Sequence, residues 1–180
     1  SVVDSSQQCP ARRARDMEFG RLWASHPRIF ARLEALEDRL GHRFVDQTLL
    51  YEALTHRSAL MELAPAPGRP AGRQVAFDLP WNERLEFLGD AVLGLAVCGR
   101  LMAQSDALAE GELSRMRAAL VNEASLAELA RALGVGDCLV LGKGAAATGG
   151  RGRDSLLADG LEALVGAVFK TCYNQRPNGS

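Results

Sequence analysis

NERLEFLGD, residues 82–90, heads one of the most apolar segments of the chain and yet carries three carboxylates. The apolar positions of the segment recur at helical spacing, which predicts a helix packed in a core. Glu86 and Asp90 are four residues apart, so they lie about 40° apart around the helix axis and project from one stripe. Like charges so placed repel each other, and the apolar surroundings favour a cation that joins them over screening by solvent.

A second acidic pair lies far downstream, in the run LLADGLEALVGAV at residues 156–168. Asp159 and Glu162 are three residues apart and share a helical face among small and aliphatic residues. Two pairs of hard oxygen ligands on rigid helices suit Mg²⁺ or Mn²⁺ and suit zinc or copper poorly. The alternative is two amphipathic helices whose acids face water, and composition alone leaves both interpretations open.

Several separated motifs resemble the ribonuclease III family. NERLEFLGD is similar to the nine-residue signature of that family, and the LTHRS run at 54–58 resembles the block that precedes it. The GELS run at 111–114 resembles the block that follows, and residues 141–164 resemble the closing block. The motifs fall in family order, and the resemblance covers roughly residues 33–173.

The resemblance implies an all-α fold, a ribonuclease III endonuclease-domain-like helical bundle that forms a homodimer. It places the catalytic, metal-binding acids at Glu86, Asp90, Asp159 and Glu162, and it implies auxiliary acidic roles for two further residues, Glu83 and Glu110. Phe87 falls where the family has an aromatic residue at the dimer interface. An ordinary core phenylalanine is the alternative at that position.

The function implied by the resemblance is divalent-metal-dependent hydrolysis of phosphodiester bonds in double-stranded RNA. The expected cofactor is Mg²⁺, with Mn²⁺ as a substitute, and the expected products carry 5′-phosphate and 3′-hydroxyl ends with short 3′ overhangs. The expected partners are ribosomal RNA precursors, structured messenger RNA and a second copy of the chain. A catalytically silent RNA- or ribosome-binding domain is the alternative, and a helical Mg²⁺ enzyme acting on nucleotides is a third.

The chain departs from the family pattern at three places. Ala145 stands where the family has Glu, Leu161 stands where it has an aromatic residue, and the connection between residues 59 and 82 is long. None of these departures removes one of the four metal acids, so they concern loop contacts.

Composition limits the function classes. The chain has 180 residues, of which 47% are hydrophobic, and a net charge of −1, which is typical of a globular domain and argues against a general basic coat for nucleic acid. Its four cysteines show no CxxC motif, so neither a zinc site nor a disulfide framework is indicated. No stretch approaches the roughly 18 apolar residues of a membrane span. We therefore expect a cytoplasmic protein without a membrane partner.

The expected organisation is one domain. Residues 1–24 are interpreted as a disordered leader or a remnant of expression, residues 25–173 as the catalytic domain, and residues 174–180 as a tail. The segment 62–80 is rich in proline and glycine, which predicts a mobile loop. No double-stranded-RNA-binding domain is expected within the chain.

Start and stop signals predict the helices. Ser25 with Pro27 opens one that ends at Gly41, and Asp46 caps one that reaches residue 58. The signature helix is expected to continue to about residue 102, and residues 112–132 to be helical with an interruption near residue 122. His26, His42 and His56 are expected to be structural hydrogen-bonding residues and not part of the site.

Residues 142–153 mix glycines with cations but fail the spacing of a phosphate-binding loop. Lys143, Arg151 and Arg153 are candidates for contacts with the RNA backbone, and a solvated loop is the alternative. The only strand signal is the short run at residues 138–141.

Overall fold

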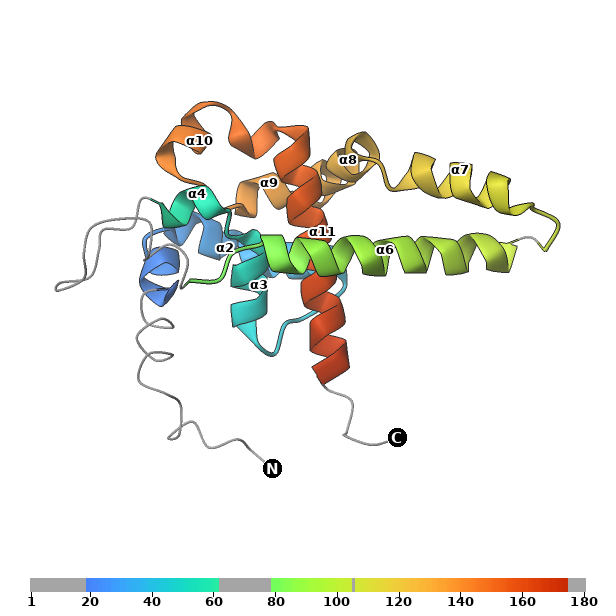
Figure 1. Ribbon diagram of the computed structural model, residues 1–180. Helices are drawn as coiled ribbons and strands as arrows, with labels where there is room; N and C mark the ends of the chain where they lie inside the picture. Colours follow the sequence, from blue (N-terminus) through green and yellow to red (C-terminus); the bar gives the residue numbers. More distant parts are fainter. Residues whose placement is uncertain (1–18, 62–78, 105, 175–180) are drawn as a thin grey trace.

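The computed structural model of the protein describes residues 19–61, 79–104 and 106–174, and these ranges are helical with short connections (Figure 1). The helices are α2 (Pro27–Leu40), α3 (Gln47–Leu54), α4 (Arg57–Leu60), α6 (Glu83–Gln104), α7 (Glu110–Leu120), α8 (Glu123–Leu133), α9 (Val135–Cys138), α10 (Lys143–Ala147) and α11 (Asp154–Asn174), with a 3₁₀ turn, η2 (Gly150–Gly152). No strand forms within the described ranges, which confirms the expected all-α class.

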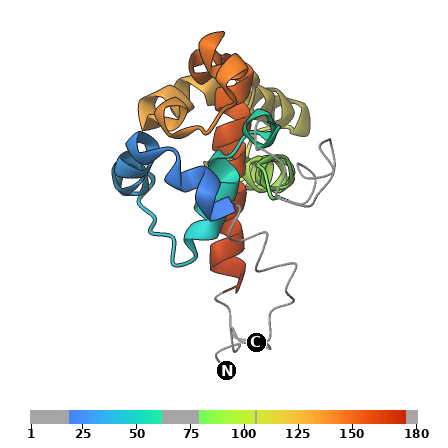
Figure 2. The same ribbon diagram turned by 90° about the vertical axis from the view of Figure 1, so that its left-hand side faces the viewer.

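Helix α11 is the centre of the bundle. It runs through the middle of the molecule in Figure 2, and α6, α8 and α3 all pack against it. Its inward positions, including Leu157, Leu161 and Leu164, are buried together with the apolar faces of the surrounding helices. None of the helices in the described ranges is both long enough and apolar enough to cross a membrane.

The predicted helix ends are largely confirmed. Pro27 occupies the first turn of α2, and Gly41 ends that helix in the left-handed conformation with φ of 64°. The carboxylate of Asp46 accepts a hydrogen bond from the Thr48 backbone nitrogen at 3.0 Å and so caps α3. Asn122 caps α8 in the same way, which explains the interruption expected there.

The boundary expected for the N-terminal leader is wrong. Residues 19–24 are helical, and Phe19, Leu22 and Trp23 are buried in the core. The indole nitrogen of Trp23 donates a hydrogen bond to the Thr55 hydroxyl at 3.1 Å. These three apolar side chains recur at helical spacing within a mostly polar stretch, and they anchor the segment in the core.

The single helix expected from Asp46 to residue 58 is also wrong. Thr55 is extended and fully buried, and it forms an isolated bridge with Val140. The Val140 backbone donates to the Leu54 carbonyl and the Val140 carbonyl accepts from the His56 backbone. These contacts divide the segment into α3 and α4, because backbone groups that bond to the 140 segment cannot bond within a helix.

Three further segments differ from their predicted structure or are described only in part. The proposed loop at 62–80 lies outside the described residues except for Leu79, which is buried, and Pro80. The 142–153 segment contains α10 and η2 in place of an irregular loop. The run at 138–141 contributes only the bridge at Val140 and no strand.

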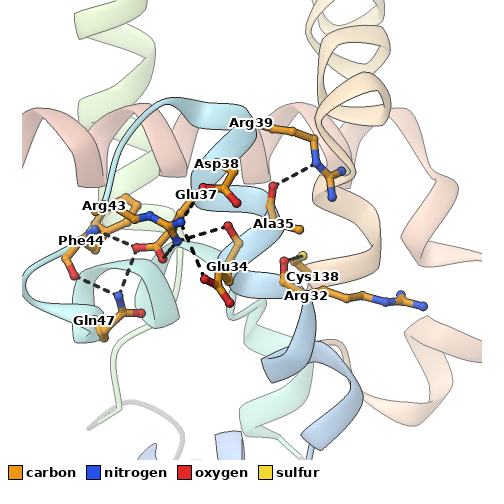
Figure 3. A network of polar contacts seen from close by, with 10 residues as sticks. All are labelled: Arg32, Glu34, Ala35, Glu37, Asp38, Arg39, Arg43, Phe44, Gln47 and Cys138. Atoms are coloured by element: carbon orange, nitrogen blue, oxygen red, sulfur yellow. Dashed lines mark hydrogen bonds and ion pairs between the residues drawn. The ribbon is translucent and has the colours of Figure 1, made fainter.

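Several arginines hold helices to one another. Glu37, buried on α2, accepts hydrogen bonds from the Phe44 backbone and from the side chains of Arg43 and Gln47 (Figure 3). Arg39 on the same helix donates to the Leu133 carbonyl at 2.8 Å, at the end of α8. The high arginine content therefore serves the fold in part, as well as any contact with a polyanion.

The second half of α6 and the whole of α7 project from the bundle as an arm (Figure 1). Leu95 and Met102 in the second half of α6 are exposed, and so are Met116 and Leu120 on α7, while Phe87 is exposed in the first half of α6. We call the exposed apolar side chains of these five residues the arm face.

Candidate metal centre

The centre is built at the crossing of α6 and α11, where two glycines let the helix backbones touch. A Cβ atom on Gly89 would overlap the carbonyl oxygen of Glu162, and a Cβ atom on Gly166 would overlap the carbonyl oxygen of Leu85. Any larger residue at either position would push the helices apart. The close approach brings the acidic stripe of α6 against the acidic stripe of α11.

Three carboxylates meet at this crossing. Glu86 of α6 and two residues of α11, Asp159 and Glu162, each offer an oxygen atom, and these oxygens lie within 4.8 Å of one another. All three side chains are half-buried. Asp90, one turn further along α6, is exposed and stands beside this group without belonging to it, although its charge raises the pKa of both Glu86 and Glu162. The structure therefore brings together three of the four predicted metal acids and places the fourth at their edge.

The electrostatics of the cluster favour protonation. Burial, followed by repulsion from Asp90, Glu86 and Asp159, raises the pKa of Glu162 to about 7. Burial and the neighbouring acids also raise the pKa of Glu86 above its ordinary value. Three carboxylates at this spacing are stable only when a cation compensates their charge or when protons neutralise part of it.

A residue that the sequence did not single out also acts on the cluster. Burial is the main cause of the raised pKa of Asp159, and the charge of Glu123 is the second. Glu123 lies in the first turn of α8, directly after the Asn122 cap. Acids are common in a first helical turn, so sequence alone gave no signal for this proximity.

The two auxiliary acids lie in different places. Glu83, in the first turn of α6, is 3.7 Å from a guanidinium nitrogen of Arg57 and raises the pKa of Glu86. Glu110 begins α7 at the outer end of the arm, where its carboxylate accepts a hydrogen bond from Ser114 (Figure 1). Within one chain Glu83 therefore borders the cluster, whereas Glu110 is far from it.

The three candidate RNA contacts also differ. Lys143 and Arg153 are exposed. Arg151 is half-buried, and one of its guanidinium nitrogens donates to the carbonyls of Gly136 at 3.0 Å and Leu139 at 2.6 Å. This nitrogen holds α9 in place, which argues against the expected RNA contact at Arg151.

Phe87 has 82% of its surface exposed, although it lies beside the buried Leu85 and half-buried Glu86. It is therefore not an ordinary core phenylalanine. Its expected role at a dimer interface stays a prediction.

Comparison with known proteins identifies the family of the chain. A family model described as Ribonuclease-III-like matches residues 46–173. The chain is 50% identical over 137 residues to Ribonuclease 3 of Syntrophobacter fumaroxidans, covering 76% of this chain and 52% of that protein. It is 46% identical over 140 residues to Ribonuclease 3 of Myxococcus xanthus, covering 78% and 50% respectively. The chain thus spans about half the length of these curated relatives.

A solved structure shares the fold. The nuclease domain of ribonuclease III from Campylobacter jejuni, described for structural flexibility in a region involved in dimer formation, superposes with a TM-score of 0.65 at 40% sequence identity. The match covers 77% of this chain and 85% of that domain. With the family model spanning most of the chain and this domain matched along most of its length, the chain belongs to the ribonuclease III family.

Proposed function

We propose that this chain carries the active site of a divalent-metal-dependent endoribonuclease that hydrolyses phosphodiester bonds in double-stranded RNA. The observation that carries the proposal is the meeting of three half-buried carboxylates, Glu86, Asp159 and Glu162, at a glycine-mediated helix crossing. Family membership supports the same reaction.

The donor set fits a hard divalent cation. All the facing ligand atoms are carboxylate oxygens, which suit Mg²⁺ and also Mn²⁺. Burial, followed by repulsion from the neighbouring acids, raises the pKa of Glu86 and of Glu162. A bound cation would relieve that repulsion. When bound, the metal supplies a water of lowered pKa and stabilises charge on the phosphoryl group.

The residues of the site divide the work. Glu86, Asp159 and Glu162 hold the cation, and Asp90 adds a fourth negative charge at the edge of the cluster. Glu83 and Glu110 keep auxiliary roles in the proposal, and Lys143 and Arg153 contact the RNA backbone. In-line attack of water on the phosphodiester leaves a 5′-phosphate and a 3′-hydroxyl, so no protein nucleophile is needed.

A homodimer fits both the substrate and the arm face. The antiparallel strands of duplex RNA are related by a two-fold axis, so two symmetric sites can cut both strands and leave short 3′ overhangs. Phe87, Leu95 and Met102 are 82%, 74% and 62% exposed and lie within about 80° of one another around α6. Exposed apolar side chains along one side of a helix are typical of an interface. We therefore assign the arm face to contact with a second copy.

The natural substrates in this proposal are ribosomal RNA precursors and structured messenger RNA in the cytoplasm. A catalytically silent RNA- or ribosome-binding domain would be favoured by loss of a metal acid. All four acids are present in the sequence, so the catalytic function is preferred.

The test is cleavage of labelled duplex RNA with Mg²⁺ and with a chelator, using Glu162→Gln beside the wild type. The amide cannot supply the charge that the cation needs, so we expect a loss of about a thousandfold or more in rate. Glu128→Gln is the matched control, because it neutralises an exposed acid on a different helix, α8, and outside the carboxylate cluster. This variant should cut RNA at the wild-type rate. Cleavage by Glu162→Gln at the wild-type rate, or wild-type cleavage in the chelator, would contradict the proposal.

A further inference from the structure

His56 is held in one tautomer by its neighbours. As the cap of α4, its Nδ1 atom accepts a hydrogen bond from the Ser58 backbone nitrogen at 3.2 Å. The Ser58 hydroxyl lies 2.8 Å from the same Nδ1 and accepts from the Gly142 backbone nitrogen at 2.9 Å. Because Nδ1 accepts the bond from the Ser58 backbone nitrogen, it carries no proton, and the Ser58 hydroxyl therefore donates to it. The neutral ring therefore carries its proton on Nε2.

The ring lies among positive charges. Burial lowers the pKa of His56, and the guanidinium groups of Arg57 and Arg153 lower it further, against the opposing effect of Glu83. A neutral ring with a fixed Nε2 donor is thus maintained beside two exposed arginines. The group combines one directed donor with two exposed cations, and phosphate oxygens bind such a combination.

The position of the group relates it to the carboxylate cluster. Arg57 pairs with Glu83 in the first turn of α6, one helical turn before Glu86. The His56 backbone is anchored to Val140, in the segment that leads to Lys143. The basic group is therefore tied both to the helix that carries Glu86 and to the segment that leads to Lys143.

We propose that the Nε2–H group of His56, together with the guanidinium groups of Arg57 and Arg153, binds a phosphate of the RNA strand beside the carboxylate cluster. This subsite rests on the proposed function and adds a substrate-binding role to His56, whose Nδ1 atom serves the fold. Its action is to position the strand, so it lowers KM without taking part in the chemistry.

Two substitutions separate the two nitrogen atoms of the ring. His56→Asn keeps an acceptor near the Nδ1 position and removes the distal donor, whereas His56→Gln keeps a distal donor and loses the capping acceptor. We expect His56→Asn to retain its melting temperature but to bind duplex RNA about tenfold more weakly. We expect His56→Gln to melt earlier and to bind RNA closer to the wild type. A purely structural His56 would give the opposite order.

The affinity is measured with labelled duplex RNA at low salt in Ca²⁺, and KM and kcat are measured separately in Mg²⁺. Arg153→Ala should also weaken binding about tenfold, while Arg28→Ala removes an exposed charge from α2 and controls for net charge alone. KM should rise in His56→Asn and Arg153→Ala with kcat little changed. If His56→Asn fails to fold, the comparison of Arg153→Ala with Arg28→Ala decides whether the phosphate subsite exists.

Wild-type affinity in folded His56→Asn, or equal losses in Arg153→Ala and Arg28→Ala, would overturn the subsite while leaving the nuclease proposal standing. A wild-type protein that binds duplex RNA but never cuts it would defeat the nuclease proposal, and the affinities of the variants would still test the subsite.

Discussion

The two halves of α6 both carry apolar side chains but meet different surroundings. The first half packs across α11, with Leu85 and Gly89 buried and the carboxylate of Glu86 at the crossing. The second half extends into the arm, where Leu95 and Met102 remain exposed. An apolar helix thus predicts a contact surface, but what covers that surface is decided by whether another element can approach.

Glycines in the two halves make the difference measurable. A Cβ atom on Gly89 has no space, because the α11 backbone occupies it. A Cβ atom on Gly94 or Gly99 meets nothing within 4 Å. The same residue type is therefore indispensable for packing in one half of the helix and unconstrained by the chain itself in the other.

The largest expected effect is that of Gly89→Ala. The added methyl group overlaps a backbone carbonyl that cannot move independently, so α6 and α11 must separate at the crossing. We expect a loss of about 3 kcal/mol or more in the free energy of unfolding and the loss of RNA cleavage, because the three acids no longer converge. Thermal unfolding and the duplex-RNA assay measure the two effects. A variant with wild-type stability and activity would show that the helices do not cross this closely.

A smaller effect is expected from Phe87→Ala in the arm face. Removing a large aromatic anchor from the centre of an interface costs about 2 kcal/mol, which corresponds to an increase of about thirtyfold in the dimer dissociation constant. The stability of the monomer should change little, because Phe87 is exposed within the chain. Sedimentation or light scattering across a concentration series measures the dissociation constant. Val45→Ala provides a control, because Val45 is also exposed but lies between α2 and α3, far in sequence from the arm face. This variant should leave the dimer dissociation constant unchanged.

The third expected effect concerns pH and metal. The pKa of Glu162 is about 7 in the folded chain against an ordinary value of 4.5, so between these pH values the folded state binds more protons than the unfolded state. The contribution of Glu162 to stability therefore declines as the pH rises from about 4.5 through 7. Without metal, this group should lower the melting temperature on going from pH 6 to pH 8.

Mg²⁺ should reverse that loss, because it compensates the ionised carboxylates. At a concentration about tenfold above its dissociation constant, it contributes about 1.4 kcal/mol, or about 4 °C in melting temperature. The rise should be larger near pH 8 than near pH 6, where protons compete with the metal, and it should be reduced in Glu162→Gln. Equal stabilisation at both pH values would argue against a metal held by Glu162. Thermal unfolding at the two pH values, with Mg²⁺ and with a chelator, provides the comparison.

The sequence predicted most of those features of the fold that are determined by neighbouring residues. The cap at Asp46, the glycine stop at Gly41, the interruption near residue 122 and the helical spacing of the signature segment each act through neighbouring residues. Asp159 and Glu162 share a stripe of one helix, which a sequence displays directly, whereas their meeting with Glu86 depends on the crossing of α6 and α11. The local features can be predicted without knowledge of the tertiary contacts.

The features that sequence did not predict all depend on distant partners. Thr55 leaves the helix because it pairs with Val140, and Arg151 turns inward because carbonyls of the α9 segment accept its hydrogen bonds. Glu123 reaches Asp159 only through the packing of α8 on α11. Nothing near these residues in the chain distinguishes them from solvated side chains, so only the assembled bundle reveals their roles.

The smallest expected effect, that of Gly99→Ala, tests the open half of α6. Within the chain the added methyl group meets nothing, and alanine loses less conformational entropy than glycine on forming a helix. We therefore expect a gain of about 0.5–1 kcal/mol in the free energy of unfolding, or about 2–4 °C in melting temperature. The measurement is thermal unfolding at a low protein concentration, where a dimer dissociates, and at a high one. A gain at low concentration that turns into a loss at high concentration would mean that the partner's backbone approaches Gly99 closely. The two halves of α6 would then follow one rule, with a glycine admitting α11 at one end and a second chain at the other.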